Sequence, residues 1–196
     1  LGIDVDKNKC ENIQKGISPF FEPELEKLLK IGLRKKLKIS TDISLMKNSD
    51  IIFVAVGTPQ RSNGSIELSM IKDAVKSIGK IVKNDTRNPI IFIKSTVTPG
   101  TMQKIVLPLL EKESGKKAGK DFGLRDTKFP HVVVLGGYQT KYMKKAKKFF
   151  SKIHPDIPLV ITNHQTAEMI KYANNSFLAT KISFINQLSN ICQNIP

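Results

Sequence analysis

The sequence has no tryptophan, three tyrosines and two cysteines among its 196 residues. Cys10 and Cys192 lie near opposite ends, without the CxxC spacing of a metal site or the density of a disulfide framework. We therefore expect inert thiols in a reduced, cytoplasmic setting. His131, His154 and His164 show no ligand spacing, so we assign no metal site.

Long apolar runs are also missing. No stretch approaches the roughly 18 unbroken apolar residues that a membrane span requires, and no charged-then-apolar leader precedes the first apolar segment. We expect a soluble protein without a membrane partner. The chain begins with Leu1 rather than methionine and stops at Pro196 as a long helix ends, so we interpret it as a fragment.

Acidic residues are scarce, since 17 Asp and Glu stand against 32 Lys and Arg, for a formal charge of +15. Such a balance is compatible with nucleic acid, an acidic membrane face or a phosphate-rich substrate. Most lysines are dispersed, however, and one denser patch comprises Lys141, Lys144, Lys145, Lys147 and Lys148. With few aromatic residues for base stacking, we predict a solvated basic surface and no specific nucleic-acid partner. A basic, non-catalytic module that binds polyanions remains the alternative of another class.

Apolar patterning predicts an α/β fold in which strands and helices alternate, typical of a doubly wound parallel sheet with helices on both faces. The expected strands are 1–5, 36–39, 51–56, 90–93, 131–135 and 158–161. The expected helices are 7–15, 22–31, a short one after Asp42, 68–83, 101–111, 138–151 and 165–192. Residues 114–128 are expected to form a loop rich in Gly and Lys, because they show no periodicity.

Two of the apolar strands end in similar polar turns. Residues 51–56 lead into Gly57-Thr58-Pro59, and residues 90–93 lead into Lys94-Ser95-Thr96-Val97-Thr98-Pro99-Gly100. Continuous apolar runs are typical of strands covered on both faces, and ligands of open α/β sheets bind outside the carboxyl ends of the strands. The two turns therefore predict a binding site at one sheet edge.

Asp4 stands at the end of the first expected strand. An acid there binds the adenosine ribose in dinucleotide-binding folds, but capping of the next helix by Asp4 or Asp6 explains it equally well. Lys9 could contact a cofactor phosphate or simply face water. The glycine-rich turn that precedes such an acid by about 20 residues is not in this sequence.

Lys171 and Asn175 are four residues apart, so on a helix they project from the same face. An ammonium and an amide side by side can stabilise an oxyanion or hold a water molecule, whereas a solvated lysine beside a polar neighbour is the plain alternative. Asn174-Asn175-Ser176 lies among apolar residues of the long helix, where short polar side chains lower helix propensity by a few tenths of a kcal/mol each. That cost favours a functional role.

Taken in order, these segments resemble the UDP-glucose/GDP-mannose dehydrogenase family, and most closely its UDP-glucose 6-dehydrogenases. The similarity covers nearly the whole chain, and residues 94–101 and 167–175 are its most specific motifs. The matching segments are Gly2-Ile3-Asp4-Val5-Asp6, Ser18-Pro19 with Glu22-Pro23, Val56-Gly57-Thr58-Pro59-Gln60, Asn63-Gly64-Ser65, residues 94–101, Leu135-Gly136-Gly137 and residues 167–175.

The resemblance implies an NAD-dependent, two-step oxidation of the C6 alcohol of UDP-glucose to a carboxylate, through a thioester on a cysteine. It also implies an incomplete NAD-binding Rossmann-like domain over 1–163 and the start of a central dimerisation domain over 164–196, with homodimerisation through the long helix. Its site roles are ribose binding by Asp4, phosphate contact by Lys9, and an NAD cleft at Gly57, Thr58, Ser95 and Thr96, with Thr96 near the reacting centre. Lys171 and Asn175 would stabilise the oxyanion and position water and substrate.

Three features of the family pattern are not found in this sequence. The first strand with its glycine-rich turn is missing, and the segment resembling Asn-Pro-Glu-Phe-Leu-Arg-Glu-Gly, which carries a catalytic glutamate, does not follow Leu124. Neither Cys10 nor Cys192 matches the motif of the nucleophilic cysteine. We therefore expect this polypeptide alone to be inactive. A UDP-N-acetylhexosamine or GDP-mannose remains an alternative substrate.

Overall fold

A computed structural model describes residues 1–128, 132–137 and 140–194. The chain divides into two compact units, Leu1–Lys47 and Asn48–Pro196. Both have the α/β composition predicted from the sequence, and most of the buried hydrophobic side chains belong to the second unit.

The first unit holds a two-stranded parallel sheet, in which β1 (Gly2–Ile3) pairs with β2 (Ile39–Ser40). Its helices are α1 (Lys7–Gln14), α2 (Leu25–Lys35) and the short 3-10 helix η1 (Ile43–Met46), which Asp42 caps as expected. The sequence predicted that this helix ends at residues 31–32. Instead, α2 continues through Gly32 to Lys35. The N–H groups of residues 36 and 37 both donate to the Gly32 carbonyl, so the helix ends one turn beyond the glycine.

The second unit is built on one five-stranded sheet in the order β3-β4-β5-β6-β7. These strands are β3 (Ile51–Val54), β4 (Ile90–Ile93), β5 (Gly123–Lys128), β6 (Val133–Gly136) and β7 (Leu159–Thr162). Strands β3, β4 and β5 are parallel, and β6 is parallel to β7. The sheet therefore presents the carboxyl ends of β3 and β4 at the same edge.

The β5–β6 pair is antiparallel, so the sheet is mixed rather than wholly parallel. The chain length explains this difference, since β5 ends at Lys128 and β6 begins at Val133. A parallel connection needs a crossover of a dozen or more residues, which this interval cannot provide. The prediction that 114–128 is a loop throughout was wrong for its last part, which forms β5.

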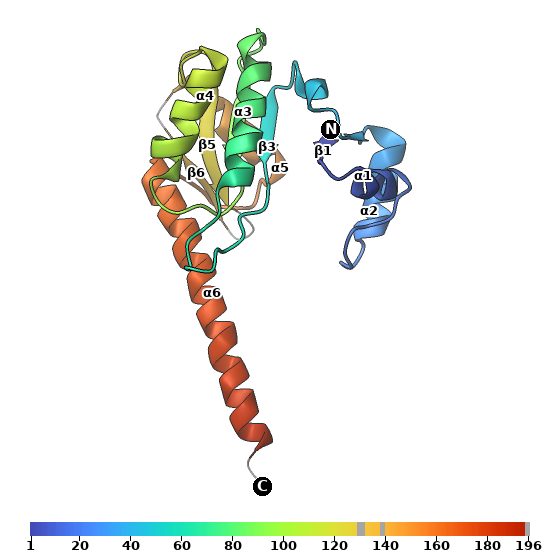
Figure 1. Ribbon diagram of the computed structural model, residues 1–196, viewed down its shortest axis with the longest axis vertical. Coiled ribbons are helices and arrows are strands. Elements are labelled where there is room, and N and C mark those ends of the chain that lie inside the picture. Colours follow the sequence, from blue (N-terminus) through green and yellow to red (C-terminus); the bar gives the residue numbers. More distant parts are fainter. Residues whose placement is uncertain (129–131, 138–139, 195–196) are drawn as a thin grey trace. The chain divides into compact units, whose positions relative to one another are not determined.

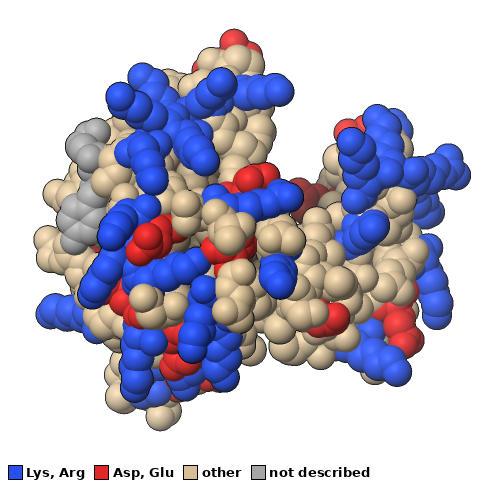
Figure 2. Space-filling model, turned by 90° about the horizontal axis from the view of Figure 1, so that it is seen from above, with Lys and Arg blue, Asp and Glu red and all other residues tan. Residues whose placement is uncertain are grey.

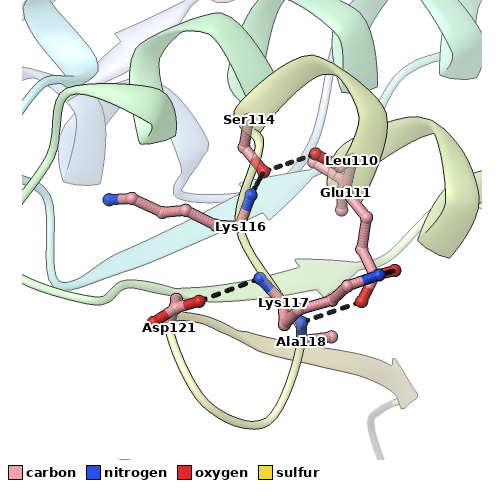
Figure 3. Close-up of polar contacts among 7 residues, drawn as sticks. All are labelled: Leu110, Glu111, Ser114, Lys116, Lys117, Ala118 and Asp121. Atoms are coloured by element: carbon pink, nitrogen blue, oxygen red, sulfur yellow. Dashed lines mark hydrogen bonds and ion pairs between the residues drawn. The ribbon is translucent and has the colours of Figure 1, made fainter.

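Residues 115–121 do form a loop, and polar contacts tie it down (Figure 3). Glu111 accepts from the Lys117 ammonium at 2.9 Å and from the N–H of Ala118 at 3.1 Å, while Asp121 accepts from the N–H of Lys117. Burial raises the pKa of Glu111, but the Lys117 and Ala118 contacts outweigh it and leave that pKa below its usual value. Hydrogen bonding rather than apolar periodicity orders this segment.

Helices cover both faces of the sheet, as predicted. On one face α3 (Ser69–Lys83) lies beside the π-helical turn η2 (Met102–Val106) and α4 (Leu107–Ser114) (Figure 1). Helix α5 (Lys141–Ile153) packs in a cluster of buried hydrophobic side chains. That cluster contains Ile90, Phe92, Val133, Leu135, Tyr142, Met143, Ala146 and Phe150. Residues 131, 138 and 139, which the sequence places in a strand and a helix, lie outside the described residues.

Helix α6 (His164–Gln193) closely matches the predicted span of 165–192. Its 30 residues make it about 45 Å long, and Figure 1 shows it running past the sheet and away from it. Apolar side chains on its outer part are more than two-fifths exposed, among them Phe177, Leu178, Ile182, Phe184, Ile185, Leu188 and Ile191. None of the described helices has the length and apolar character that a bilayer crossing requires.

The distribution of the core predicts independent stability of the second unit. Within residues 1–47, all of which the structure describes, Cys10 is the one buried hydrophobic side chain. We expect removal of residues 1–47 to change the free energy of unfolding of the second unit by less than about 1 kcal/mol, because the second unit keeps all of its own buried hydrophobic side chains. Urea unfolding monitored by circular dichroism measures this, and loss of a cooperative transition would contradict it.

Candidate active site

The two polar turns meet at the carboxyl edge of the sheet. After β3 ends at Val54 and β4 ends at Ile93, the N–H groups of Lys94 and Ser95 both donate to the carbonyl of Val54, at 2.8 and 3.3 Å. The Ser95 hydroxyl then donates to the carbonyl of Val56 at 2.6 Å. These bonds join the exit of β3 to the exit of β4, as the sequence predicted.

The loop after β3 carries Gly57 and Thr58, of which Gly57 is exposed and Thr58 half-buried. Further along, the N–H of Glu67 donates to the carbonyl of Pro59 at 2.8 Å, and Arg61 forms an ion pair with Glu67 at 2.6 Å. The Arg61 hydrogen bond, helped by the N–H of Ser69, holds the pKa of Glu67 at about 2. Glu67 therefore keeps its charge at any physiological pH and ties the loop to the start of α3.

Lys171 and Asn175 reach this edge from α6. The Lys171 ammonium donates to the carbonyl of Lys94 and, at 2.8 Å, to that of Ser95. The Asn175 amide donates to the hydroxyl of Thr96 at 3.1 Å. The structure thus brings Ser95, Thr96, Lys171 and Asn175 together, although nearly eighty residues separate the two segments in the sequence.

Chemically, this constellation presents an ammonium, an amide and a threonine hydroxyl side by side. Two of the three donors of the Lys171 ammonium point at backbone carbonyls, which fixes the direction of the side chain. Groups of this kind stabilise negative charge that develops on a reacting oxygen. The arrangement is suited to alcohol or aldehyde chemistry at the sheet edge.

A functional residue that the sequence did not single out is Glu168. Its side chain is 1% exposed, and its two carboxylate oxygens accept the N–H groups of Gly100 at 2.6 Å and Met102 at 2.7 Å. Glu168 precedes Lys171 by three residues on the same helix face. Glu168 is the one acidic residue of α6, but nothing in the sequence indicates which groups it would contact.

Asp4 and Lys9 belong to the first unit. The Asp4 carboxylate forms an ion pair with Lys9 and also accepts the N–H of Asp6 at 3.1 Å. Asp6 is the residue that caps α1, through the N–H of Lys9 at 3.0 Å, so the capping alternative applies to Asp6 and not to Asp4. The Lys9 hydrogen bond holds the pKa of Asp4 below its usual range, against an opposing effect of burial.

Cys192, the cysteine of the second unit, does not lie at the Lys171 site. Cys10 is buried in the first unit and donates to the carbonyl of Asp4 at 3.5 Å. Cys192 is exposed on α6, about 30 Å further along the helix than Lys171 at 1.5 Å per residue. Among the described residues, no group of three or more His, Cys, Asp or Glu side chains could hold a metal ion.

Basic side chains are spread over the surface. In Figure 2, Lys and Arg side chains lie among acidic and uncharged ones and do not gather into one stripe. Several lysines pair with acids at short sequence separations, including Lys7 with Glu11, Lys30 with Glu26 and Lys76 with Asp73. On the face that Figure 2 shows, the charge does not mark a nucleic-acid groove.

Two family models match most of the chain. The NAD-binding domain of the UDP-glucose/GDP-mannose dehydrogenase family matches residues 1–154, and the central domain of that family matches residues 165–195. The chain belongs to this family. The matched NAD-binding domain makes NAD the cofactor, and family members are NAD-dependent nucleotide-sugar dehydrogenases.

Curated and solved relatives give the extent of the likeness. A GDP-mannose 6-dehydrogenase of Pseudomonas syringae is 34% identical over 208 residues, covering 98% of this chain and 47% of the relative. A UDP-glucose 6-dehydrogenase of Bacillus subtilis is 41% identical over 205 residues, covering 98% and 46%. The GDP-mannose dehydrogenase structure from Pseudomonas aeruginosa superposes with a TM-score of 0.88 at 34% identity, covering 98% of this chain and 47% of that one.

The chain spans about half the length of the curated relatives it matches. The alignments also run over more positions than the chain has residues, so the relatives carry residues that this chain lacks.

After Leu124, where the family resemblance predicts the glutamate-bearing segment, Arg125 follows within β5 and is 1% exposed. Its guanidinium donates to the carbonyl of Leu124 and to the hydroxyl of Thr140, and burial lowers the pKa of Arg125 to about 10.

The residues that the family resemblance assigns to NAD are chemically suited to it. A carboxylate at the end of β1 can accept ribose hydroxyls, and Asp4 is a charged acceptor because the Lys9 ion pair keeps it ionised. The hydroxyls and backbone groups at Thr58, Ser95 and Thr96 follow strands at the sheet edge where cofactors of open α/β folds bind.

We expect Lys9→Met to raise the pKa of Asp4 toward its usual value, because the largest effect that lowers it is the Lys9 hydrogen bond. In the parent chain this ion pair stabilises the fold above the unfolded-state pKa of Asp, and the contribution is lost as pH falls through the lower folded-state value. A pH titration of the Asp4 carboxyl resonance by NMR measures the change. Lys7→Met is the control, since Lys7 pairs with Glu11, and an unmoved Asp4 titration in Lys9→Met would contradict the assignment.

Proposed function

We propose that this chain forms the cofactor-binding part and the start of the central domain of a nucleotide-sugar 6-dehydrogenase. The whole protein would oxidise the C6 alcohol of UDP-glucose to the carboxylate of UDP-glucuronate with two NAD+ through a cysteine thioester. The observation that carries the proposal is the meeting of Thr96, Lys171 and Asn175 at the carboxyl edge of the sheet.

Within that reaction, each residue of the chain has a role in binding or in charge stabilisation. Asp4 would bind the adenosine ribose and Lys9 the phosphate side of the cofactor. Gly57, Thr58 and Ser95 would line the nicotinamide nucleotide, which supplies the hydride acceptor when bound. A larger side chain at Gly57 would first meet the Met70 sulfur, at 3.4 Å from the added Cβ.

Three residues would act on the sugar. Thr96 would lie near the reacting centre, beside Asn175, whose amide donates to the Thr96 hydroxyl. Lys171 would stabilise the oxyanion that forms when the aldehyde is attacked, and Asn175 would hold the water or the substrate. These roles rest on the contacts above and on the match of residues 165–195 to the central domain of the family.

The choice of UDP-glucose is supported by the 41% identity to the Bacillus subtilis UDP-glucose 6-dehydrogenase, against 34% to the Pseudomonas syringae GDP-mannose 6-dehydrogenase. GDP-mannose and a UDP-N-acetylhexosamine remain the alternatives.

A homodimer through α6 is proposed for the whole protein, because the outer part of that helix exposes several large apolar side chains.

The binding part of the proposal predicts where NAD+ acts on the chain. In an NMR titration, we expect NAD+ to shift the amide resonances of Gly57, Thr58, Ser95 and Thr96. Residues 115–121 serve as the internal control. They precede β5, which is parallel to β4, and so lie at the amino ends of the strands, opposite the candidate site. Shifts confined to other regions, or no shifts at millimolar NAD+, would count against the assignment of this edge to the cofactor.

The chemical part predicts that the chain alone produces no detectable NADH from UDP-glucose and NAD+. The reason is the lack of both the segment that carries the catalytic glutamate and a matching nucleophile, since Cys10 is buried and Cys192 lies far along α6. The measurement is NADH absorbance over hours, with the Bacillus subtilis UDP-glucose 6-dehydrogenase as the active control. Measured turnover would overturn this account.

The polyanion-binding alternative predicts a different result. A basic module would bind generic DNA with a steep dependence on salt, because affinity would come from counterion release. Dispersed charge does not account for the contacts between α6 and residues 94–96, so the dehydrogenase proposal is preferred.

A further inference from the structure

The buried carboxylate of Glu168, on α6, caps the start of the η2–α4 segment. The N–H groups of Gly100 and Met102 lie at the beginning of the η2–α4 segment, where the first N–H groups of a helix have no partner within it. Thr101, at the capping position, makes no side-chain capping bond to it. Glu168 takes over that role from 66 to 68 residues further along the chain, with one oxygen on each N–H.

The loop that Glu168 contacts is already held in shape. The Thr101 hydroxyl donates to the carbonyl of Thr98 at 2.6 Å, and Gly100 adopts a φ of +92°, a conformation that glycine allows and other residues rarely adopt. Glu168 therefore joins two preformed elements, the loop of residues 94–102 and the rigid helix α6. Glu168 determines how helix α6 lies against the loop of residues 94–102.

Three contacts of α6 with this loop follow one another along a single helix face. Glu168 binds residues 100 and 102, Lys171 binds the carbonyls of residues 94 and 95, and Asn175 binds the hydroxyl of residue 96. Positions three and seven residues apart share a face, and seven residues rise about 10 Å. Glu168 is the most deeply buried of the three, and its two bonds are short and charge-assisted.

We propose that Glu168 is the positioning residue of the candidate site. It sets the register of α6 against residues 94–102, so that Lys171 and Asn175 meet Ser95 and Thr96. It acts through these residues and not on the reacting atoms. The catalytic meaning of that register rests on the proposed function, but the register itself is a property of this chain without any ligand.

The informative substitution is Glu168→Gln. Glutamine keeps the size and one acceptor oxygen, but its NH2 group faces an N–H that needs an acceptor, which leaves a buried donor unpaired. Glu111→Gln is the matched control, because Glu111 also accepts a backbone N–H, from Ala118, and lies away from α6.

The test uses the full 196-residue chain under native conditions, with circular dichroism to verify folding. We expect Glu168→Gln to accelerate amide exchange at Gly100 and Met102 roughly tenfold or more. The distinguishing readout is the side-chain NH2 resonance of Asn175, which should move toward its position in free asparagine. Glu111→Gln should change neither.

Two results would overturn the proposal. One is faster exchange at Gly100 and Met102 with an unmoved Asn175 resonance, which would make Glu168 a local structural group only. The other is no change at either place. If Glu168→Gln does not fold, Glu168→Asp takes its place, since it keeps the charge and reaches at most one of the two N–H groups. An unmoved Asn175 resonance in Glu168→Asp then rejects the proposal.

This test and the test of the proposed function fail separately. The Asn175 readout needs no cofactor or substrate, whereas the cofactor assignment is tested by the NAD+ titration. A shifted Asn175 resonance without NAD+ shifts at Thr58 and Thr96 would leave the positioning role intact and reject the cofactor assignment.

Discussion

The helix that begins near residue 101 has free N–H groups at its start, and α6 satisfies two of them with the buried carboxylate of Glu168. An unpaired N–H in this buried position would cost about 1–3 kcal/mol. That requirement holds α6 against residues 94–102. Once this contact is made, Lys171 and Asn175 arrive at the sheet edge through helix geometry alone.

The sheet supplies the other half of the arrangement. Because β3 and β4 are parallel and in register from Ile51 and Ile90 to Val54 and Ile93, both strands end at the same level. The Ser95 hydroxyl then reaches the carbonyl of Val56 and joins their exits. A parallel pair thus places two separate polar turns side by side, and α6 lies against the second of them.

Charge has a smaller part in this structure than the composition suggests. The net charge of +15 is carried mostly by exposed lysines, and exposed ion pairs contribute little to stability. At the site, the contacts of Glu168 are buried, and most polar contacts there involve backbone groups. Electrostatics is therefore local here, at Glu168, at Lys171 and at the Asp4–Lys9 pair.

The sequence alone determined the elements with strong periodicity, such as α3 and α6, the apolar strands β3 and β4, and the two turns that follow them, because apolar spacing and turn chemistry are local properties. It did not reveal β5, whose residues 123–128 lack a strand pattern and are ordered by pairing with β4 and β6. Nor did it reveal Glu168, which looks like an ordinary helix acid until Gly100 and Met102 lie beside it. Only the tertiary structure could decide these, since each depends on partners that are distant in the chain.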